Sequence, residues 1–245
     1  FCFDSYGLFI TTTPATITSH GEESGEFTAT IPANTRRIHF IANQNMTDFQ
    51  EDEFRNKSEA DVIALLEGSS GMMIYWARFA CDANNEEPID QQLAKNPNII
   101  MIRNQAKITI DNPTGNGYLV VTGFTAYNTN AFGTVAPYHP TKGWVWSSNA
   151  DVEPFVTLPA NDAKLSDIQD VQDISQNPEL YVFECENSSE DPVSVIIRGH
   201  LPGESEELYY RVMLIKANGE QELIRRNHHY MFHIAGALSY GQPTF

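Results

Sequence analysis

The chain has 245 residues, 41% of them hydrophobic, which is enough to bury the core of one large domain or of two ordinary ones. Its 15 basic residues face 32 acidic ones, and the net charge of −17 repels phosphate backbones and anionic lipid headgroups. Nucleic acid is therefore not expected as a partner, and no apolar run reaches the roughly 18 residues that a membrane-spanning helix needs.

The first residues predict a β-hairpin that is entered partway along a strand. Phe1, Phe3, Leu8 and Ile10 alternate with more polar residues on either side of a turn at 4–7. We therefore expect sequence upstream of Phe1. The lack of a signal or lipid-attachment segment in this sequence is then no evidence against export.

Alternation of apolar and polar residues dominates the rest of the chain and predicts an all-β fold. Turn signals rich in Pro, Gly, Asn and Asp separate the alternating stretches. The predicted strands after the opening hairpin are 26–31, 37–42, 72–78, 99–110, 118–127, 180–185, 193–201, 208–215 and 229–235.

Two short helices are predicted among these strands. Ser58 and Asp61 approximate a capping box, and Gly68 ends the helix that follows them. The second helix is predicted over 166–174, where apolar residues recur at every third position and acidic residues lie on the other side.

A connection between two β-units is predicted at 137–163, where periodicity is lost and Pro, Asn, Asp and Ser are frequent. We place the boundary near residue 149. The predicted domains are then 1–148, with its first strands expected to be missing, and 149–245, each with enough strands for a β-sandwich.

The run "ELIRRNHHYMFHI" at 222–234 raises the question of a metal site. On a strand His229 and His233 share a face with Met231, but they stand roughly 13 Å apart, which is too far for direct chelation by the pair. His228 lies on the opposite face. We therefore predict no metal here and assign these histidines to an ordinary antiparallel strand.

Clusters of acidic residues could hold calcium through oxygen ligands, but neither has EF-hand spacing or a loop pinned by glycine. We expect solvated surface charge at both places. The residues concerned are Glu184, Glu186, Glu190 and Asp191 around a turn, and Asp167, Asp170 and Asp173 on the second predicted helix.

No pattern typical of catalysis is found, so we predict that the chain is not an enzyme and has no cofactor. There is no G-x-S-x-G elbow, and Cys81 and Cys185 fall in strand-like stretches, as small buried residues do. The segment "EGSSGMM" lacks the lysine and the glycine spacing of a phosphate-binding loop. The three cysteines show no disulfide framework.

Aromatic residues in "GWVWSS" suggest a different kind of site. Trp144 and Trp146 share one strand face, near Tyr138 and His139, and could form a platform on which sugars stack. Packing in a core or between domains is the alternative that we favour.

Several stretches, in order along nearly the whole chain, resemble the fimbrillins, the type V pilin superfamily of Bacteroidetes. They are "RRIHFIAN" at 36–43, "MMIYWARF" at 72–79, "IMIRNQAKITID" at 100–111, "GFTAYNTNAFGTVAP" at 123–137, "VIIRGHL" at 195–201, "YYRVMLI" at 209–215 and "IRRNHHYMFHI" at 224–234.

This resemblance implies two transthyretin-like Greek-key β-sandwiches. It also implies export as a lipoprotein precursor, contact with the outer membrane only through the precursor lipid, and polymerisation into adhesive fimbriae on the cell surface. In that family a protease removes an N-terminal strand, and a strand of a neighbouring subunit fills the groove left behind. The expected partners are thus other fimbrial subunits and a receptor on a host or bacterial surface.

As a hypothesis, the early strands border this groove, and their apolar residues accept the donor side chains. The residues assigned to the groove are Phe1, Phe3, Ile10, Ile38, Phe40 and Ala42. The alternative function is a glycan-binding lipoprotein of the outer surface that uses Trp144 and Trp146. A metal-dependent hydrolase ranks third.

Overall fold

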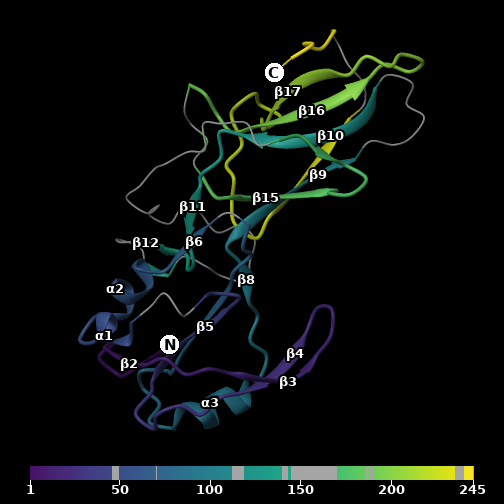
Figure 1. Ribbon diagram of the computed structural model, residues 1–245. Helices are drawn as coiled ribbons and strands as arrows, with labels where there is room; N and C mark the ends of the chain where they lie inside the picture. Colours follow the sequence, from purple (N-terminus) through teal and green to yellow (C-terminus); the bar gives the residue numbers. More distant parts are fainter. Residues whose placement is uncertain are drawn as a thin grey trace. The chain divides into compact units, whose positions relative to one another are not determined.

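The computed structural model describes residues 1–45, 50–69, 71–111, 119–139, 143–144, 170–185, 187, 190–234 and 240–244. The fold is all-β, as predicted, with three short helices among the described residues (Figure 1). None of these helices is long and apolar enough to cross a membrane. The chain divides into two compact units, which are described separately.

Unit 1 comprises Phe1–Glu67 and Ile74–Ile102. Its sheet has the order β2-β1-β5-β7-β8, with neighbours β1, β2, β5 and β7 paired antiparallel. The strands are β1 (Cys2–Phe3), β2 (Phe9–Thr11), β5 (Arg37–Ala42), β7 (Tyr75–Ala80) and β8 (Ile102–Arg103). A separate hairpin, β3 (Thr16–His20) and β4 (Gly25–Thr28), is exposed along its whole length.

The three helices of unit 1 are α1 (Glu51–Phe54), α2 (Glu59–Ala64) and α3 (Ile89–Lys95). Helix α2 confirms the predicted capping box, because the Ser58 hydroxyl accepts a hydrogen bond from the Asp61 amide. Phe54, at the end of α1, is buried and packs edge-on against the rings of Phe1 and Phe9. Helices α1 and α3 were not predicted, since neither begins with a side-chain cap like that of Ser58 in α2.

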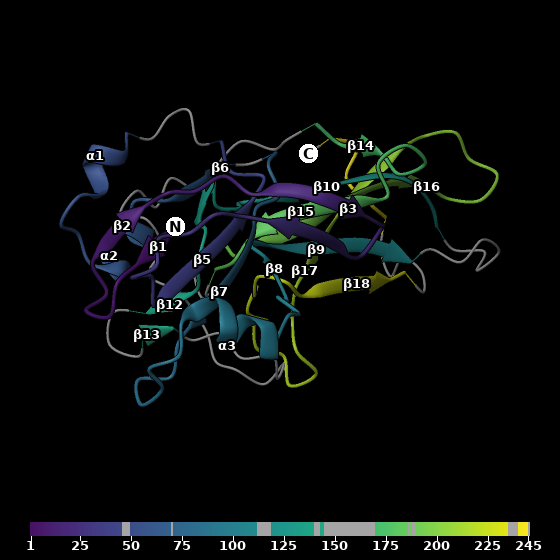
Figure 2. The same ribbon diagram turned by 90° about the horizontal axis from the view of Figure 1, so that it is seen from below.

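Unit 2 comprises Gly68–Met73 and Arg103–Phe245 and contains a β-sandwich. One sheet has the order β14-β10-β16-β17, and the other has the order β15-β9-β18. The strands are β14 (Gln172–Asp173), β10 (Val120–Tyr127), β16 (Ser194–His200), β17 (Leu208–Met213), β15 (Glu179–Phe183), β9 (Gln105–Asp111) and β18 (His229–His233). Figure 2 shows β18 alongside β9, to which it runs parallel.

The core of unit 2 lies between these two sheets. Ile108 from β9 and Val182 from β15 meet Phe124 from β10 and Ile197 from β16, and all four are buried. Two smaller two-stranded pairs complete the described structure: β6 (Glu67–Ser69) with β11 (Phe132–Thr134), and β12 (Tyr138–His139) with β13 (Gly143–Trp144).

The division between the units differs from the boundary that we expected near residue 149. The described part of 103–144 belongs to unit 2 because β9 pairs with β15 and β18, and β10 pairs with β16. Loss of periodicity at 137–163 marks an irregular stretch of sequence, but the partners of the preceding strands lie after that stretch. A pattern within one strand carries no information on such distant partners.

The second predicted helix is wrong where the structure describes it. Gln172 and Asp173 form β14, which pairs antiparallel with Phe124 and Gly123 of β10. Residues 166–169 lie outside the described residues. The pairing is close because Gly123 has no side chain: a Cβ atom there would lie 2.5 Å from the Gln172 carbonyl oxygen.

A glycine near one end of the β10–β16 ladder gives a prediction for stability. A Cβ atom on Gly199 would lie 2.5 Å from the Val120 carbonyl oxygen, so backbone must move in a Gly199→Ala variant. We expect a loss of about 1–3 kcal/mol in the free energy of unfolding. Urea unfolding measures it. Gly21→Ala is the control and should change stability by less than about 0.5 kcal/mol, since its nearest contact would be 3.4 Å. Equal effects of the two variants would contradict the prediction.

Candidate functional site

The early strands assigned to a donor groove lie inside the sheet of unit 1 for most of their length. Strand β5 pairs with β7 along its whole length, but β1 covers only Arg37 and Ile38 on the other side. One residue further, Phe1 and His39 exchange two backbone hydrogen bonds of 3.0 Å each. Backbone groups alternate in direction along a strand, so Ile41 presents its amide and carbonyl to the same side as His39.

No described strand pairs with Ile41 on that side. The line of β1 along β5 therefore stops before β5 ends. We call the stretch of β5 from Phe40 to Ala42 on this side the β5 edge. It is short, and it is the only part of the early strands, among the described residues, at which a further strand could extend the line of β1.

The six residues assigned to the groove do not share one surface. By register Phe1 and Phe3 lie on the face of β5 that carries His39, whereas Ile38, Phe40 and Ala42 lie on the opposite face. Phe3 and Ile38 are fully buried in unit 1 itself. Phe1, Ile10, Phe40 and Ala42 are half-buried.

Phe40 is already in contact with another part of unit 1, because the ring of Phe27 in hairpin β3–β4 lies 5.7 Å from it, edge to face. Entry of donor side chains at these six positions stays a prediction.

A second open edge lies in unit 2, along β18. The His228 carbonyl accepts a hydrogen bond from the Lys107 amide of β9, and the Ile234 amide donates one to the Asp111 carbonyl. The backbone groups of the even-numbered residues of β18 therefore face β9. The amides and carbonyls of His229, Met231 and His233 then point away from β9. No described strand pairs with them, because β18 is the last strand of its sheet. We call this side of the strand the β18 edge.

A groove of about 350 Å³ is formed by residues of β18 and the end of β17 with the residues after it. Its lining combines polar and apolar groups, and among the apolar ones Ile215 and Met231 are each about 60% exposed. The lining residues are Met213, Leu214, Ile215, Glu222, Tyr230, Met231, Phe232 and His233. The sequence predicted this strand, but alternation alone could not show that its outer side lacks a partner.

The histidines of β18 confirm the strand interpretation. His229 hydrogen-bonds to the Thr109 hydroxyl at 2.7 Å, and His233 to an Asp111 carboxylate oxygen at 2.8 Å, so each engages the neighbouring strand. Tyr230, Phe232 and Ile234 pack against the core from the other face. The strand runs parallel to β9, not antiparallel as expected. Within the described residues no group of three metal-ligating side chains is close enough to hold an ion.

One residue of the acidic clusters corrects the expectation of solvated charge. Glu184 is buried and forms a two-pronged ion pair with Arg226, at 2.6 and 3.0 Å. Glu190, Asp170 and Asp173 are exposed, as expected. Asp191 pairs with Arg211 at 2.5 Å, and Glu186 and Asp167 lie outside the described residues.

The predicted aromatic platform is described in part. Trp144, in β13, is half-buried and lies 4.7 Å from the ring of Tyr138 in β12, with the rings tilted by 57°. Trp146 lies outside the described residues. The close ring contact is ordinary aromatic packing, as the alternative interpretation expects.

Unit 1 contains a buried ionic cluster that the sequence did not reveal. Glu59, at the start of α2, accepts hydrogen bonds from His39 at 2.7 Å and from Arg78 at 2.5 Å. A third partner, Arg37, donates to Glu59 at 3.0 Å. The other ring nitrogen of His39 accepts a bond of 2.9 Å from the Trp76 indole. This cluster ties α2 to β5 and β7.

The surroundings shift the pKa values of both central groups. Burial lowers the pKa of His39 to about 4, although the nearby Glu59 acts in the opposite direction. Burial alone would raise the pKa of Glu59, but hydrogen bonds from His39 and Arg78 outweigh it and hold that pKa at about 2. His39 is therefore neutral and Glu59 ionised at neutral pH. Every group in this cluster is engaged within unit 1, as a structural network would be.

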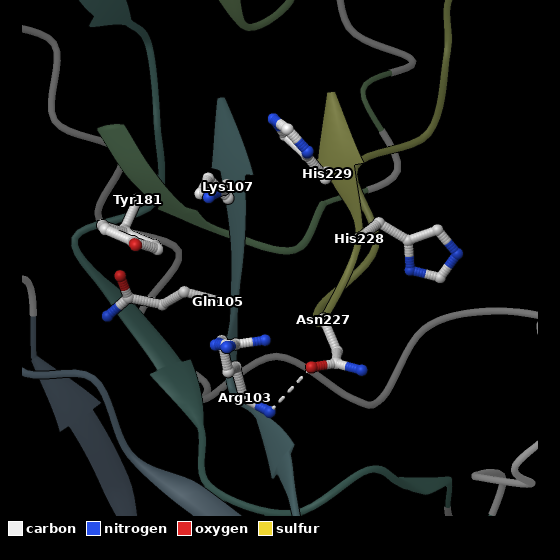
Figure 3. Close-up of a pocket in the computed structure, with 7 residues that line it drawn as sticks. All are labelled: Arg103, Gln105, Lys107, Tyr181, Asn227, His228 and His229. Carbon is white, nitrogen blue, oxygen red and sulfur yellow. Dashed lines mark hydrogen bonds between the residues drawn. The ribbon is translucent and has the colours of Figure 1, made fainter. Parts of the chain in front are cut away.

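A polar pocket of about 90 Å³ opens on the sheet β15-β9-β18 (Figure 3). By register, Tyr181 and His229 flank Lys107 in one row across the three strands. Arg103 lies at the end of the pocket where β9 begins, and its amide donates to the Asn227 side chain at 3.2 Å (Figure 3). Only the strand pairing shows that these residues converge.

Comparison with known protein families and with curated proteins finds no match for the sequence. Solved structures are similar in fold. A "putative cell adhesion protein" from Bacteroides eggerthii aligns over 94% of this chain and 76% of its own, with a TM-score of 0.50 and 11% identity. Another protein so described, from Parabacteroides distasonis, aligns over 98% of this chain and 87% of its own, with a TM-score of 0.49 and 15% identity.

Proposed function

We propose that the chain is a fimbrial subunit or tip adhesin of a Gram-negative bacterium and mediates cell adhesion at the cell surface. It reaches the outer membrane as a lipoprotein precursor. A protease then removes an N-terminal strand, and copies assemble by inserting a strand of one into an open edge of the next. The fold likeness to a solved structure described in terms of cell adhesion supports this role.

The observation that carries the proposal is the β18 edge beside a groove in which Ile215 and Met231 are exposed. Unpaired amides and carbonyls next to exposed apolar side chains form the surface that an incoming strand completes, with backbone bonds for affinity and pockets for alternate side chains. An edge of this kind invites uncontrolled association unless another segment covers it. The β5 edge in unit 1 offers a second, shorter place for such a strand.

The test uses proline, which removes one amide hydrogen and is tolerated on the open side of an edge strand. Met231→Pro deletes a donor that points away from β9, so the ladder with β9 stays intact. Met231→Ala removes the side chain and keeps the amide. Ile41→Pro is the corresponding change at the β5 edge.

We expect electron microscopy of the protease-treated full-length protein to show filaments for the wild type and for Met231→Ala. Filaments should be lost in Met231→Pro, in Ile41→Pro or in both, and the result identifies the edge that accepts the donor strand. Circular dichroism verifies folding. The proposal would be contradicted if the wild type stays monomeric after processing, or if both proline variants form filaments.

A glycan-binding lipoprotein of the outer surface is the second candidate, since Trp144 is half-buried beside Tyr138 and aromatic rings of this kind stack on sugars. In that case glycan-array binding should fall in Trp144→Ala and in Trp146→Ala. It should persist in Met231→Pro, which separates this function from strand-mediated assembly.

A further inference from the structure

The outer side of β18 lacks the features that usually keep an edge strand from associating. Natural edges carry Lys, Pro or a bulge, or another segment covers them. Strand β18 has the sequence HYMFH, with no proline and no Lys, Arg, Asp or Glu, and it pairs with β9 without a register shift. It is the last strand of its sheet, and no described strand pairs with its outer side (Figure 2). This edge therefore needs a partner.

The order of residue types in β18 is the same in both directions. Met231 lies at the centre, an aromatic residue lies on either side of it, and a histidine lies at each end. When two identical strands pair across a two-fold axis, residue i contacts residue j and j contacts i. An axis at Met231 sets Met231 opposite itself, Tyr230 opposite Phe232, and His229 opposite His233. Each contact then joins side chains of the same kind.

The backbone of β18 permits this register. The amides and carbonyls of His229, Met231 and His233 point away from β9. In an antiparallel ladder such residues form the hydrogen-bonded pairs, in which each residue donates one bond and accepts one. An axis at Met231 pairs all three residues within β18, whereas an axis at Tyr230 or Phe232 leaves one of them without a partner in that strand. The backbone thus favours one register among those that two-fold symmetry allows.

The aromatic pairs of this register lie on the side of the groove. Tyr230 and Phe232 pack against the core of unit 2 and also line the groove. They occupy the closely spaced pairs of the ladder, where side chains approach most closely and aromatic rings stabilise a sheet. Met231, which is 61% exposed in one copy, meets its counterpart on the other face. The second copy therefore covers apolar surface that one copy leaves exposed.

The histidines complement each other on the outer face of the sheet. Nδ1 of His233 donates to an Asp111 carboxylate, so Nε2 of the neutral ring is an acceptor. Nε2 of His229 bonds to the Thr109 hydroxyl, and when that hydroxyl donates, Nδ1 of His229 carries a hydrogen. No described group bonds to His233 Nε2 or His229 Nδ1. In the register about Met231 this donor of one copy faces this acceptor of the other, on both sides of the axis.

Charge limits where two copies can meet. Each copy carries a net charge of −17, so most of the surface of one copy repels the other. Strand β18 itself carries no formal charge when its histidines are neutral. Glu222 is the one acidic residue of the groove lining, and Asp111 is bonded to His233. A contact along β18 thus brings few like charges together.

We propose that β18 pairs with β18 of a second copy, antiparallel and about Met231, to form a two-fold dimer. The sheets β15-β9-β18 of the two copies become one continuous sheet. One short strand from each copy makes a small interface, so the dimer is transient, with a dissociation constant of about 1–100 µM. The inference rests on the proposed function for its biological role: the dimer covers the β18 edge until a donor strand displaces it.

Sedimentation velocity of the chain without protease treatment tests for the dimer. From about 1 to about 300 µM it should show a reversible equilibrium between monomer and dimer. Met231→Pro removes the amide hydrogen next to the axis in both copies and should weaken dimerisation about tenfold or more. Met231→Ala is the matched variant that keeps the amide, and it should still form the dimer. Circular dichroism verifies that both variants are folded.

A cysteine at the axis tests the register. The Cα atoms of a hydrogen-bonded pair lie about 5.5 Å apart, which a disulfide can span. The background is Cys81→Ser, because Cys81 is partly exposed and the other two native cysteines are buried. Met231→Cys should then give a disulfide-linked dimer under mild oxidation. His229→Cys is the control, since the two copies of that position are separated by roughly 13 Å along the ladder and should not cross-link.

Three results would overturn the inference: the chain stays monomeric over that range of concentration, Met231→Pro dimerises as well as the wild type, or His229→Cys cross-links as readily as Met231→Cys. Electron microscopy after processing measures filaments separately. Filaments from a chain that never dimerises would support the proposed function and contradict this inference. A dimer that gives no filaments after processing would do the reverse, so the two failures are distinguishable.

Discussion

Replacing Arg226 by Met is expected to lower the free energy of unfolding of unit 2 by about 3–5 kcal/mol, the cost of leaving a buried charge without its partner. Arg226 and Glu184 are both buried. The guanidinium also donates to the Val135 carbonyl at 3.0 Å and to the Thr134 hydroxyl at 2.6 Å. The variant therefore removes the guanidinium donors of one carboxylate and of two further acceptors.

Urea unfolding followed by circular dichroism measures this loss. The double variant Arg226→Met with Glu184→Leu removes both charges, and it should recover much of the lost stability, because a buried ion pair costs desolvation that an apolar pair does not. Arg225→Met, at the adjacent position, is the control for a change of one charge. If Arg226→Met costs less than about 1 kcal/mol, the pair behaves as an exposed one and the assignment is wrong.

Acidification from pH 7 to pH 4 is expected to lower the free energy of unfolding of unit 1 by up to about 3 kcal/mol. This is the free energy that corresponds to a His39 pKa of 6.5 in the unfolded chain and of about 4 in the folded protein. In this window the unfolded chain binds a proton at His39, whereas the folded protein does not. Stability therefore falls as the pH drops from 6.5 toward 4. Glu59 adds a second loss as the pH falls from 4.5 toward 2, because its pKa is depressed in the folded state.

The contacts of His39 explain why it resists protonation. One ring nitrogen donates to Glu59, and the other accepts from the Trp76 indole. A proton on the second nitrogen would bring its N–H group against the N–H group of the Trp76 indole, at a buried position where water cannot accept either hydrogen.

Thermal melts between pH 7 and pH 3 test the pH dependence. His39→Gln should flatten the curve between pH 6.5 and pH 4, and His20→Gln, at an exposed position, should leave it unchanged. NMR titration of the wild type gives the His39 pKa even where the variant does not fold. A value near 6.5 would refute the argument.

Features of the fold that depend on residues close together in the sequence were the ones that could be predicted. Alternation located β5, β9, β10, β16, β17 and β18, because it depends on which residues of one strand face the core. The capping box at Ser58 was found for the same reason, since its two members are three residues apart. Short helices such as α3, with seven residues, leave too few turns for a pattern to stand out.

Features that depend on pairing could not be predicted. The alternation of β18 is the same whether it runs parallel or antiparallel, or lies at the edge or the centre of a sheet. Glu184 and Arg226 are 42 positions apart, and neither has a local signal of burial. His39 shares a face of β5 with Arg37, opposite Ile38 and Phe40, so alternation assigns it to the polar face and does not indicate its burial.

The parallel pairing of β18 with β9 has a consequence for synthesis. Asp111 and His233, which face each other across these strands, are 122 positions apart in the chain. At a translation rate of 5–20 residues per second, about 6–24 s pass between the synthesis of β9 and that of β18, its last neighbour. During that time one side of a hydrophobic strand remains available to other nascent chains. Slow closure of this kind favours a holding chaperone, and it makes the yield of folded protein sensitive to the speed of translation.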